Sequence, residues 1–185
     1  QSGFTLVEMV VAVGLFSIVS VLIAQLFVLF NRAQVRSSLQ QQMQSDGRVM
    51  MAQIADRIRS ASIDYVSYGG AISFPDDTLF LIDEDNVAVT IAQTSIAANC
   101  PSAQSTPCLV ISEGGADFSP LSSDSFTVDQ VQFFIDPSTD PAESGGDNIQ
   151  PRVTFAIEMN AINSSSIQQV SANLQTTVSS RVYFR

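Results

Sequence analysis

The chain has 185 residues, 45% of them apolar, and a formal net charge of −10. It contains no Lys, His or Trp, which removes an amine nucleophile, the commonest metal ligand and the usual general base. No Gly-rich phosphate loop follows a predicted strand, so the sequence predicts no enzyme. The acidic balance disfavours direct nucleic-acid binding, because phosphate is repelled.

The segment from Phe4 to Phe30 is apolar and long enough to cross a bilayer as a helix, for which about 20 residues suffice. A cleaved secretory signal would need a basic start and a small-residue cleavage site after its core, and neither is present. A plain signal anchor fits the length. That interpretation leaves the Glu8 carboxylate without a partner. An unpaired carboxylate costs roughly 2.5 to 3.5 kcal/mol at the centre of a membrane helix and less near the end of the helix.

The N-terminal run Gly3-Phe4-Thr5-Leu6-Val7-Glu8 resembles the type IV prepilin processing motif. The resemblance implies that a prepilin peptidase cuts between Gly3 and Phe4 and methylates the new Phe4 amine. Residues 1–3 are then expected to be the end of a leader. The resemblance also implies that Glu8 pairs with the terminal amine of a neighbouring subunit and sets the register of assembly.

The resemblance implies a single-pass protein of the bacterial inner membrane with an extracytoplasmic head, which later enters a pilus or pseudopilus. Arg32 and Arg36 depart from this expectation, because they follow the apolar stretch. The positive-inside rule alone would place the domain after them in the cytoplasm. More positive charge in the leader would be needed to reverse that orientation.

The helix is predicted to continue as an amphipathic helix over residues 31–65, giving about 60 residues in all. No Pro occurs between Phe4 and Phe74. One apolar stripe at helical spacing is formed by Leu39, Met43, Met50, Ile54, Ile58 and Ala61. A coiled coil is the alternative, although Gly47 and Arg57 interrupt a strict heptad. Gly14 and Gly47 are expected to destabilise the helix by about 1 kcal/mol each relative to Ala.

Residues 66–185 are predicted to form a β-rich head domain. The β-favouring runs are Ala71–Phe74, Thr78–Ile82, Val87–Ala92, Cys108–Ile111, Phe126–Ile135, Arg152–Met159 and an alternating tail from Leu174 to Ser180. Within Arg152–Met159, the large apolar residues alternate with Thr154, Ala156 and Glu158, which predicts a half-buried strand. We expect an antiparallel sheet of about five to seven strands that covers the stripe of the helix. The predicted class is therefore α+β, with a long N-terminal helix, transmembrane in its first half, on an antiparallel head.

The pair Arg152–Met159 and Asn173–Tyr183 resembles the closing hairpin of larger minor pilins, and Gln41–Ala61 resembles the helix of W-type minor pilins and J-type pseudopilins. This implies a minor, initiating or tip-proximal subunit of a type IV pilus or a type II secretion pseudopilus. The implied partners are other subunits through the N-terminal helix, the prepilin peptidase, an inner-membrane assembly platform and the lipid bilayer. The alternative is a membrane-anchored extracytoplasmic ligand-binding or adhesin domain that acts alone.

Cys100 and Cys108 lie in a short stretch between Asn99 and Leu109 that also holds two prolines. A metal site would need more Cys or a His. A disulfide that closes a small loop, formed outside the cytoplasm, is the favoured interpretation. Two free thiols in a cytosolic loop are the alternative.

The loop over residues 136–148 offers the carboxylates of Asp136, Asp140, Glu143 and Asp147. Calcium takes six to eight oxygen ligands from a flexible loop, so this composition suits it. The spacing does not match an EF-hand, and a solvated acidic connection is the alternative. No other cofactor is predicted.

Overall fold

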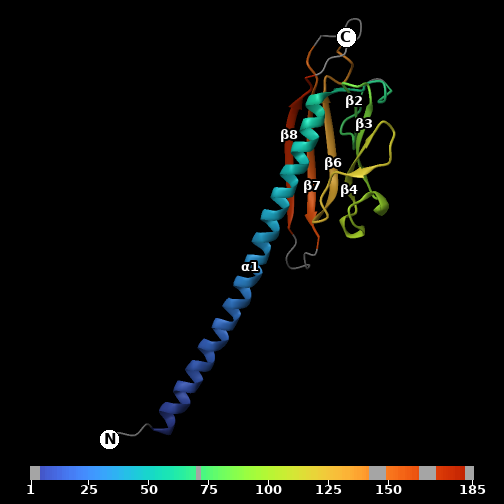
Figure 1. Ribbon diagram of the computed structural model, residues 1–185. Helices are drawn as coiled ribbons and strands as arrows, with labels where there is room; N and C mark the ends of the chain where they lie inside the picture. Colours follow the sequence, from blue (N-terminus) through green and yellow to red (C-terminus); the bar gives the residue numbers. More distant parts are fainter. Residues whose placement is uncertain (1–4, 70–71, 142–148, 163–169, 182–185) are drawn as a thin grey trace. The chain divides into compact units, whose positions relative to one another are not determined.

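The computed structural model describes residues 5–69, 72–141, 149–162 and 170–181 (Figure 1). The chain forms two compact units, Gln1–Leu39 and Gln40–Arg185, and each is described by itself. One α-helix, α1 (Leu6–Ser60), runs through the first unit and into the second. The second unit is the head, in which the end of α1 packs on β-strands.

The head contains two antiparallel sheets among its described residues. The five-stranded sheet has the order β1 (Ala61–Ile63), β2 (Thr78–Asp83), β3 (Ala88–Thr94), β4 (Cys108–Glu113) and β5 (Ser119–Pro120). The three-stranded sheet has the order β6 (Phe126–Asp136), β7 (Arg152–Ala161) and β8 (Ser171–Ser179). Two short 3-10 helices, η1 (Ala97–Asn99) and η2 (Ala103–Ser105), precede β4. The predicted α+β class, a long helix on an antiparallel head, is confirmed.

The strands divide into two sheets, whereas a single sheet was expected. β5 is two residues long and ends at Pro120, which has no backbone N–H to extend the ladder. β6 then begins a new sheet with a register shift between Val128 and Gln130. An isolated bridge links Asp76, which precedes β2, to Phe133 of β6 through backbone hydrogen bonds of 3.2 and 2.8 Å.

The first expected strand, Ala71–Phe74, is not a strand where the structure describes it. Ile72 donates its N–H to the Ser138 carbonyl at 3.1 Å, so this segment is held by a loop instead of a ladder. Ala71 lies outside the described residues. The other expected runs match β2, β3, β4, β6, β7 and β8 to within a few residues.

α1 ends at Ser60, earlier than the expected residue 65. The Ser60 hydroxyl donates to the Asp56 carbonyl at 3.0 Å within the last turn. The next residues pair with β2, with Ala61 opposite Asp83 and Ile63 opposite Leu81. The backbone groups of Ala61–Ile63 find their hydrogen-bond partners in β2, and a helix that continued to residue 65 would lose this pairing.

The apolar stripe of α1 is buried against the head. Met43, Met50, Ile54 and Ile58 are each no more than 2% exposed. Alternate side chains of β7, from Val153 to Met159, are buried as well, which confirms the predicted half-buried strand. The stripe is therefore used within the chain, and the coiled-coil alternative is not needed to explain it.

Gly47 is a close-contact position in this interface. A Cβ placed on it would lie 2.7 Å from Leu174 Cδ1 and 2.8 Å from Met159 Cε. Gly47, which was expected only to destabilise the helix, is therefore the residue that lets α1 approach β7 and β8 closely. Gly14 has nothing within 4 Å of the same position.

Candidate functional site

The N-terminal turn of α1 is closed by a reciprocal pair of hydrogen bonds between Thr5 and Glu8. The Thr5 backbone N–H donates to Glu8 Oε2 at 3.1 Å, and the Glu8 N–H donates to Thr5 Oγ1 at 3.3 Å. This is a capping box, in which each side chain accepts from a backbone donor of the other residue. Thr followed three residues later by Glu is the sequence signature of this box, which the predictions from sequence did not include.

The capping box fixes the place of the Glu8 carboxylate at the positive end of the helix dipole. Both residues are exposed, so the second carboxylate oxygen is open to another donor. Gly3 and Phe4 lie outside the described residues. Cleavage after Gly3, methylation of Phe4 and pairing of Glu8 with a neighbouring amine therefore stay predictions.

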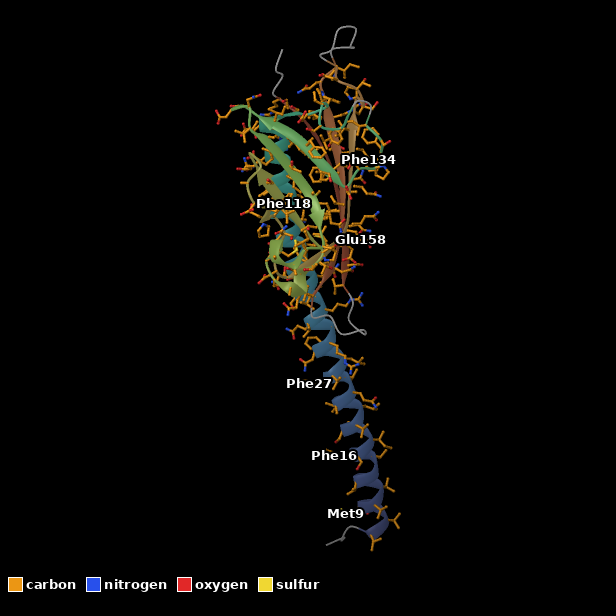
Figure 2. All side chains as sticks on the ribbon, turned by 90° about the vertical axis from the view of Figure 1, so that its right-hand side faces the viewer. Met9, Phe16, Phe27, Phe118, Phe134 and Glu158 are labelled. Atoms are coloured by element: carbon orange, nitrogen blue, oxygen red, sulfur yellow. A yellow bond between two sulfur atoms is a disulfide. The ribbon has the colours of Figure 1, made fainter. Side chains whose placement is uncertain are left out.

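Within the first unit, residues 6–30 present a long apolar surface in which Glu8 and Gln25 are the only strongly polar residues. Its most apolar 18-residue window has a mean hydropathy of 2.6 and no buried residue, which makes α1 long and apolar enough to cross a membrane. Met9, Phe16 and Phe27 project from the helix without other side chains over them (Figure 2). Apolar surface of this extent needs lipid or neighbouring helices around it.

Small residues interrupt the bulky surface of this segment. Gly14 leaves open space, and the Ser17 hydroxyl bends back to the Val13 carbonyl at 2.8 Å. The hydroxyl is thereby satisfied inside its own helix and exposes no strong polar group to lipid. Positions of this kind allow two helices to approach closely.

In the head, Cys100 and Cys108 form the predicted disulfide, with their Cα atoms 5.7 Å apart. The bond closes the loop that contains η1 and η2 against the start of β4. The free-thiol alternative is wrong. A structural disulfide agrees with a head outside the cytoplasm.

The acidic loop that was predicted to hold calcium is described only in part. Asp136 accepts from Arg152, whose Nε and Nη2 lie 2.7 and 2.6 Å from Asp136 Oδ2. Asp140 also has a partner. Glu143 and Asp147 lie outside the described residues, and no group of three His, Cys, Asp or Glu suited to a metal occurs in the part that is described. The calcium site stays a prediction.

Tyr68 is the titratable group whose environment is most perturbed in the described head. Burial raises the pKa of this phenol above its ordinary value of 10.0, and Asp76 and Asp64 add to the rise. The hydroxyl donates to the Thr78 carbonyl and accepts from the Phe80 N–H, at 3.0 and 3.1 Å. These bonds hold the turn after β1 onto β2, so the perturbed pKa has a structural cause.

A surface hollow of the head, about 740 Å³, is lined mainly by acidic and amide side chains. It includes Asp76, Asp77, Asp129 and Glu158, and Figure 2 places Glu158 on the same side of the sheet as Phe134. Because the chain contains no His or Lys, the titratable groups of this hollow are carboxylates.

Residues 1–24 match the family model of the prokaryotic N-terminal methylation motif. No curated protein and no solved structure matches the chain. The matched motif covers the predicted cleavage site, the capping box and most of the apolar segment. It implies a prepilin that a prepilin peptidase processes and that assembles with other pilin subunits. The motif, the apolar helix after it and the packing of that helix on antiparallel sheets together support the type IV pilin-like family for this chain.

Proposed function

We propose that this chain is a minor structural subunit, initiating or tip-proximal, of a type IV pilus or a type II secretion pseudopilus. The observation that carries the proposal is the juxtaposition of a methylation motif at residues 1–24 with a wholly exposed apolar helix. A motif that creates a new N-terminus directly before such a helix suits a subunit that is stored in a membrane and later packed among like helices.

The mechanism is mechanical. The apolar part of α1 holds the processed subunit in the inner membrane until an assembly platform extracts it. Helices of successive subunits then replace lipid around the same surface, so the apolar side chains are never transferred into water. Gly14 and Ser17 let neighbouring helices approach in this bundle.

Glu8 determines the register of the bundle. Its carboxylate accepts from Thr5 at the N-terminal turn and keeps an exposed side from which the methylated Phe4 amine of a neighbour can approach. An ion pair of this kind is stronger in an apolar filament core than in water, because the effective dielectric constant falls. A shift of one residue would separate the charges and leave Glu8 buried and unpaired, which is costly.

A minor position, instead of the major one, is supported by the resemblance of Gln41–Ala61 to the helices of W-type minor pilins and J-type pseudopilins. The structure adds that these residues hold a head of two sheets closed by a disulfide. An elaborate, acidic head suits a subunit that is present in few copies and acts at an end of the filament.

The test is the intact mass of the membrane-extracted protein after expression of the full precursor with a matching prepilin peptidase. The proposal predicts loss of every residue through Gly3 and the addition of one methyl group. Gly3→Ala blocks this change. Glu8→Ala leaves cleavage intact and reduces co-isolation with the other subunits by about tenfold, the effect of losing roughly 1.4 kcal/mol.

Gln25→Ala is the matched control, because Gln25 is the other strongly polar residue of the apolar segment. It is expected to leave both cleavage and co-isolation unchanged. An uncut wild-type chain that stays a stable monomer in the membrane would overturn the proposal. That outcome would favour the anchored binding domain that acts alone.

A further inference from the structure

The outer edge of β8 is a long strand edge that the described head leaves without a partner, and we propose that it docks an extended acidic segment of another subunit. The docking mode is strand addition, in which backbone hydrogen bonds extend the three-stranded sheet by one strand. The inference rests on the proposed function in one respect, namely that the partner belongs to the same assembly.

The other sheet edges of the described head are short or covered. β1 is three residues long, and β5 is two residues long and ends at Pro120. The edge of β6 is covered by the other sheet: Val128 donates its N–H to the Pro107 carbonyl at 2.8 Å, and Gln93 Nε2 donates to the Val128 carbonyl at 2.7 Å. Natural proteins protect sheet edges by such means.

β8 has none of these protections. It is nine residues long, with the sequence Ser-Ala-Asn-Leu-Gln-Thr-Thr-Val-Ser, and contains neither a charge nor a Pro. It pairs with β7 without a register shift from Ser171 to Ser179. Figure 1 shows it as the outermost strand of its sheet, on the side away from β2 and β3. An uncharged edge of this length without a bulge is suited to pair with another strand.

The two flanks of α1 beside the sheet differ in charge: one carries Asp46 and Arg57, which both have partners in the head, and the other carries Arg48 and Arg59. Successive residues of an α-helix are about 100° apart, and Gly47 faces β7 and β8. On one flank, Asp46 Oδ2 accepts from the Ser125 hydroxyl at 2.7 Å and Arg57 pairs with Glu113, so this flank faces β6 and β4. The same rotation places Arg48 and Arg59 on the opposite flank, beside β8.

Arg181 lies two residues after the end of β8 and donates its N–H to the Arg59 carbonyl at 3.2 Å, which brings these two residues together. Within the described residues, the guanidinium groups of Arg48, Arg59 and Arg181 form no ion pair, whereas those of Arg57 and Arg152 do. All three are exposed. The β8 edge is therefore bordered by three available cations in a chain whose net charge is −10.

These charges select the occupant. A strand with carboxylates would place them near the three arginines while its backbone pairs with β8, so both the hydrogen bonds and the charges are satisfied. Pairing of β8 with β8 of a second copy would instead bring two sets of three arginines together, which like-charge repulsion disfavours. The occupant is therefore an acidic segment of another subunit and not the β8 edge of a second copy.

The experiment measures binding of a fluorescent peptide to the full-length protein in detergent. The peptide is as long as β8, with Glu alternating with Thr or Val, and its binding is followed by fluorescence anisotropy. A peptide with Lys in place of Glu tests the charge. A peptide whose backbone nitrogens are methylated at two consecutive central residues lacks a donor on each edge and tests strand addition.

The proposal predicts that the acidic peptide binds, and that both altered peptides bind at least about tenfold more weakly. Arg48→Glu and Arg181→Glu each weaken binding, while Arg48→Lys retains it. Gln53→Glu is the matched control, because this exposed residue lies on the flank of Asp46 and Arg57. It adds the same charge and leaves binding unchanged.

The proposal is overturned if the acidic peptide does not bind. It is also overturned if the methylated peptide binds equally well, because binding would then be simple charge attraction. Dimerisation of the chain that the peptide does not reverse would overturn it as well. Cleavage after Gly3 is measured on the same preparations. Normal cleavage without peptide binding rejects the docking edge alone, whereas an uncut chain rejects the proposed function.

Discussion

The two parts of α1 use similar residues in opposite ways. Over residues 6–38 every side chain is exposed, and over residues 6–30 apolar residues occupy the whole circumference of the helix. Over residues 40–60 the apolar residues form one stripe, and Met43, Met50, Ile54 and Ile58 are buried by the head. The arrangement of apolar residues around the helix, more than their number, therefore separates a segment that needs lipid or other subunits from one that folds on its own chain.

The largest expected effect comes from removing core volume in the second part. Ile54 is 0% exposed, so Ile54→Ala is expected to destabilise the head by about 2–5 kcal/mol. Leu22→Ala in the first part removes a side chain that is 54% exposed, and we expect no change in the stability of the head. Chemical denaturation of the full chain in detergent, followed by tyrosine fluorescence, measures both. Equal losses of unfolding free energy in the two variants would show that the two parts of α1 do not differ in their contribution to the head.

Gly14 and Gly47, one in each part of α1, test the same difference in packing. Gly47→Ala places a methyl group against Leu174 and Met159, and overpacking of this kind costs about 1–3 kcal/mol. Ala regains about 1 kcal/mol of helix propensity, so the expected net loss is about 1 kcal/mol. Gly14→Ala meets nothing within 4 Å and leaves the head unchanged. The same denaturation experiment checks the pair, and a stabilised Gly47→Ala head would show that the ends of the Leu174 and Met159 side chains move aside at little cost.

The smallest expected effect is a pH dependence confined to the head. Because burial raises the pKa of Tyr68, the neutral phenol is favoured in the folded state. Its contribution is complete below the ordinary tyrosine pKa of about 10 and is lost as the pH rises further. Tyr68→Phe should reduce the fall in stability above pH 10 and cost about 1 kcal/mol at neutral pH through two lost hydrogen bonds.

Thermal unfolding at a series of pH values between 7 and 11 tests this prediction. The apolar part of α1 contains no Tyr, so its helicity should not follow the same titration. An identical pH slope in the wild type and in Tyr68→Phe would show that the phenol does not titrate with unfolding.

Local patterns in the sequence predicted the parts of the fold that depend on neighbours along the chain. The stripe from Met43 to Ile58, the alternation of β7 and the Cys100–Cys108 bond were all predicted and are confirmed. The Thr5–Glu8 capping box was equally readable, since its two residues lie three apart.

What escaped prediction depends on contacts between distant residues. Gly47 looked like a weak point because its partners, Leu174 and Met159, lie more than a hundred residues further along the chain. The division into two sheets follows from where β5 stops and β6 starts, which strand propensity alone does not determine. The free edge of β8 and its bordering arginines likewise exist only once the strands have been ordered.

The most direct test of the division within α1 is cysteine labelling in spheroplasts with a membrane-impermeant maleimide. The native cysteines form a disulfide and do not react, so single Phe16→Cys and Gln44→Cys variants report on the two parts. The account predicts rapid labelling at position 44 and labelling at position 16 only after detergent is added. Labelling of both positions before detergent, or of neither, would contradict a membrane-embedded first part followed by an extracytoplasmic head.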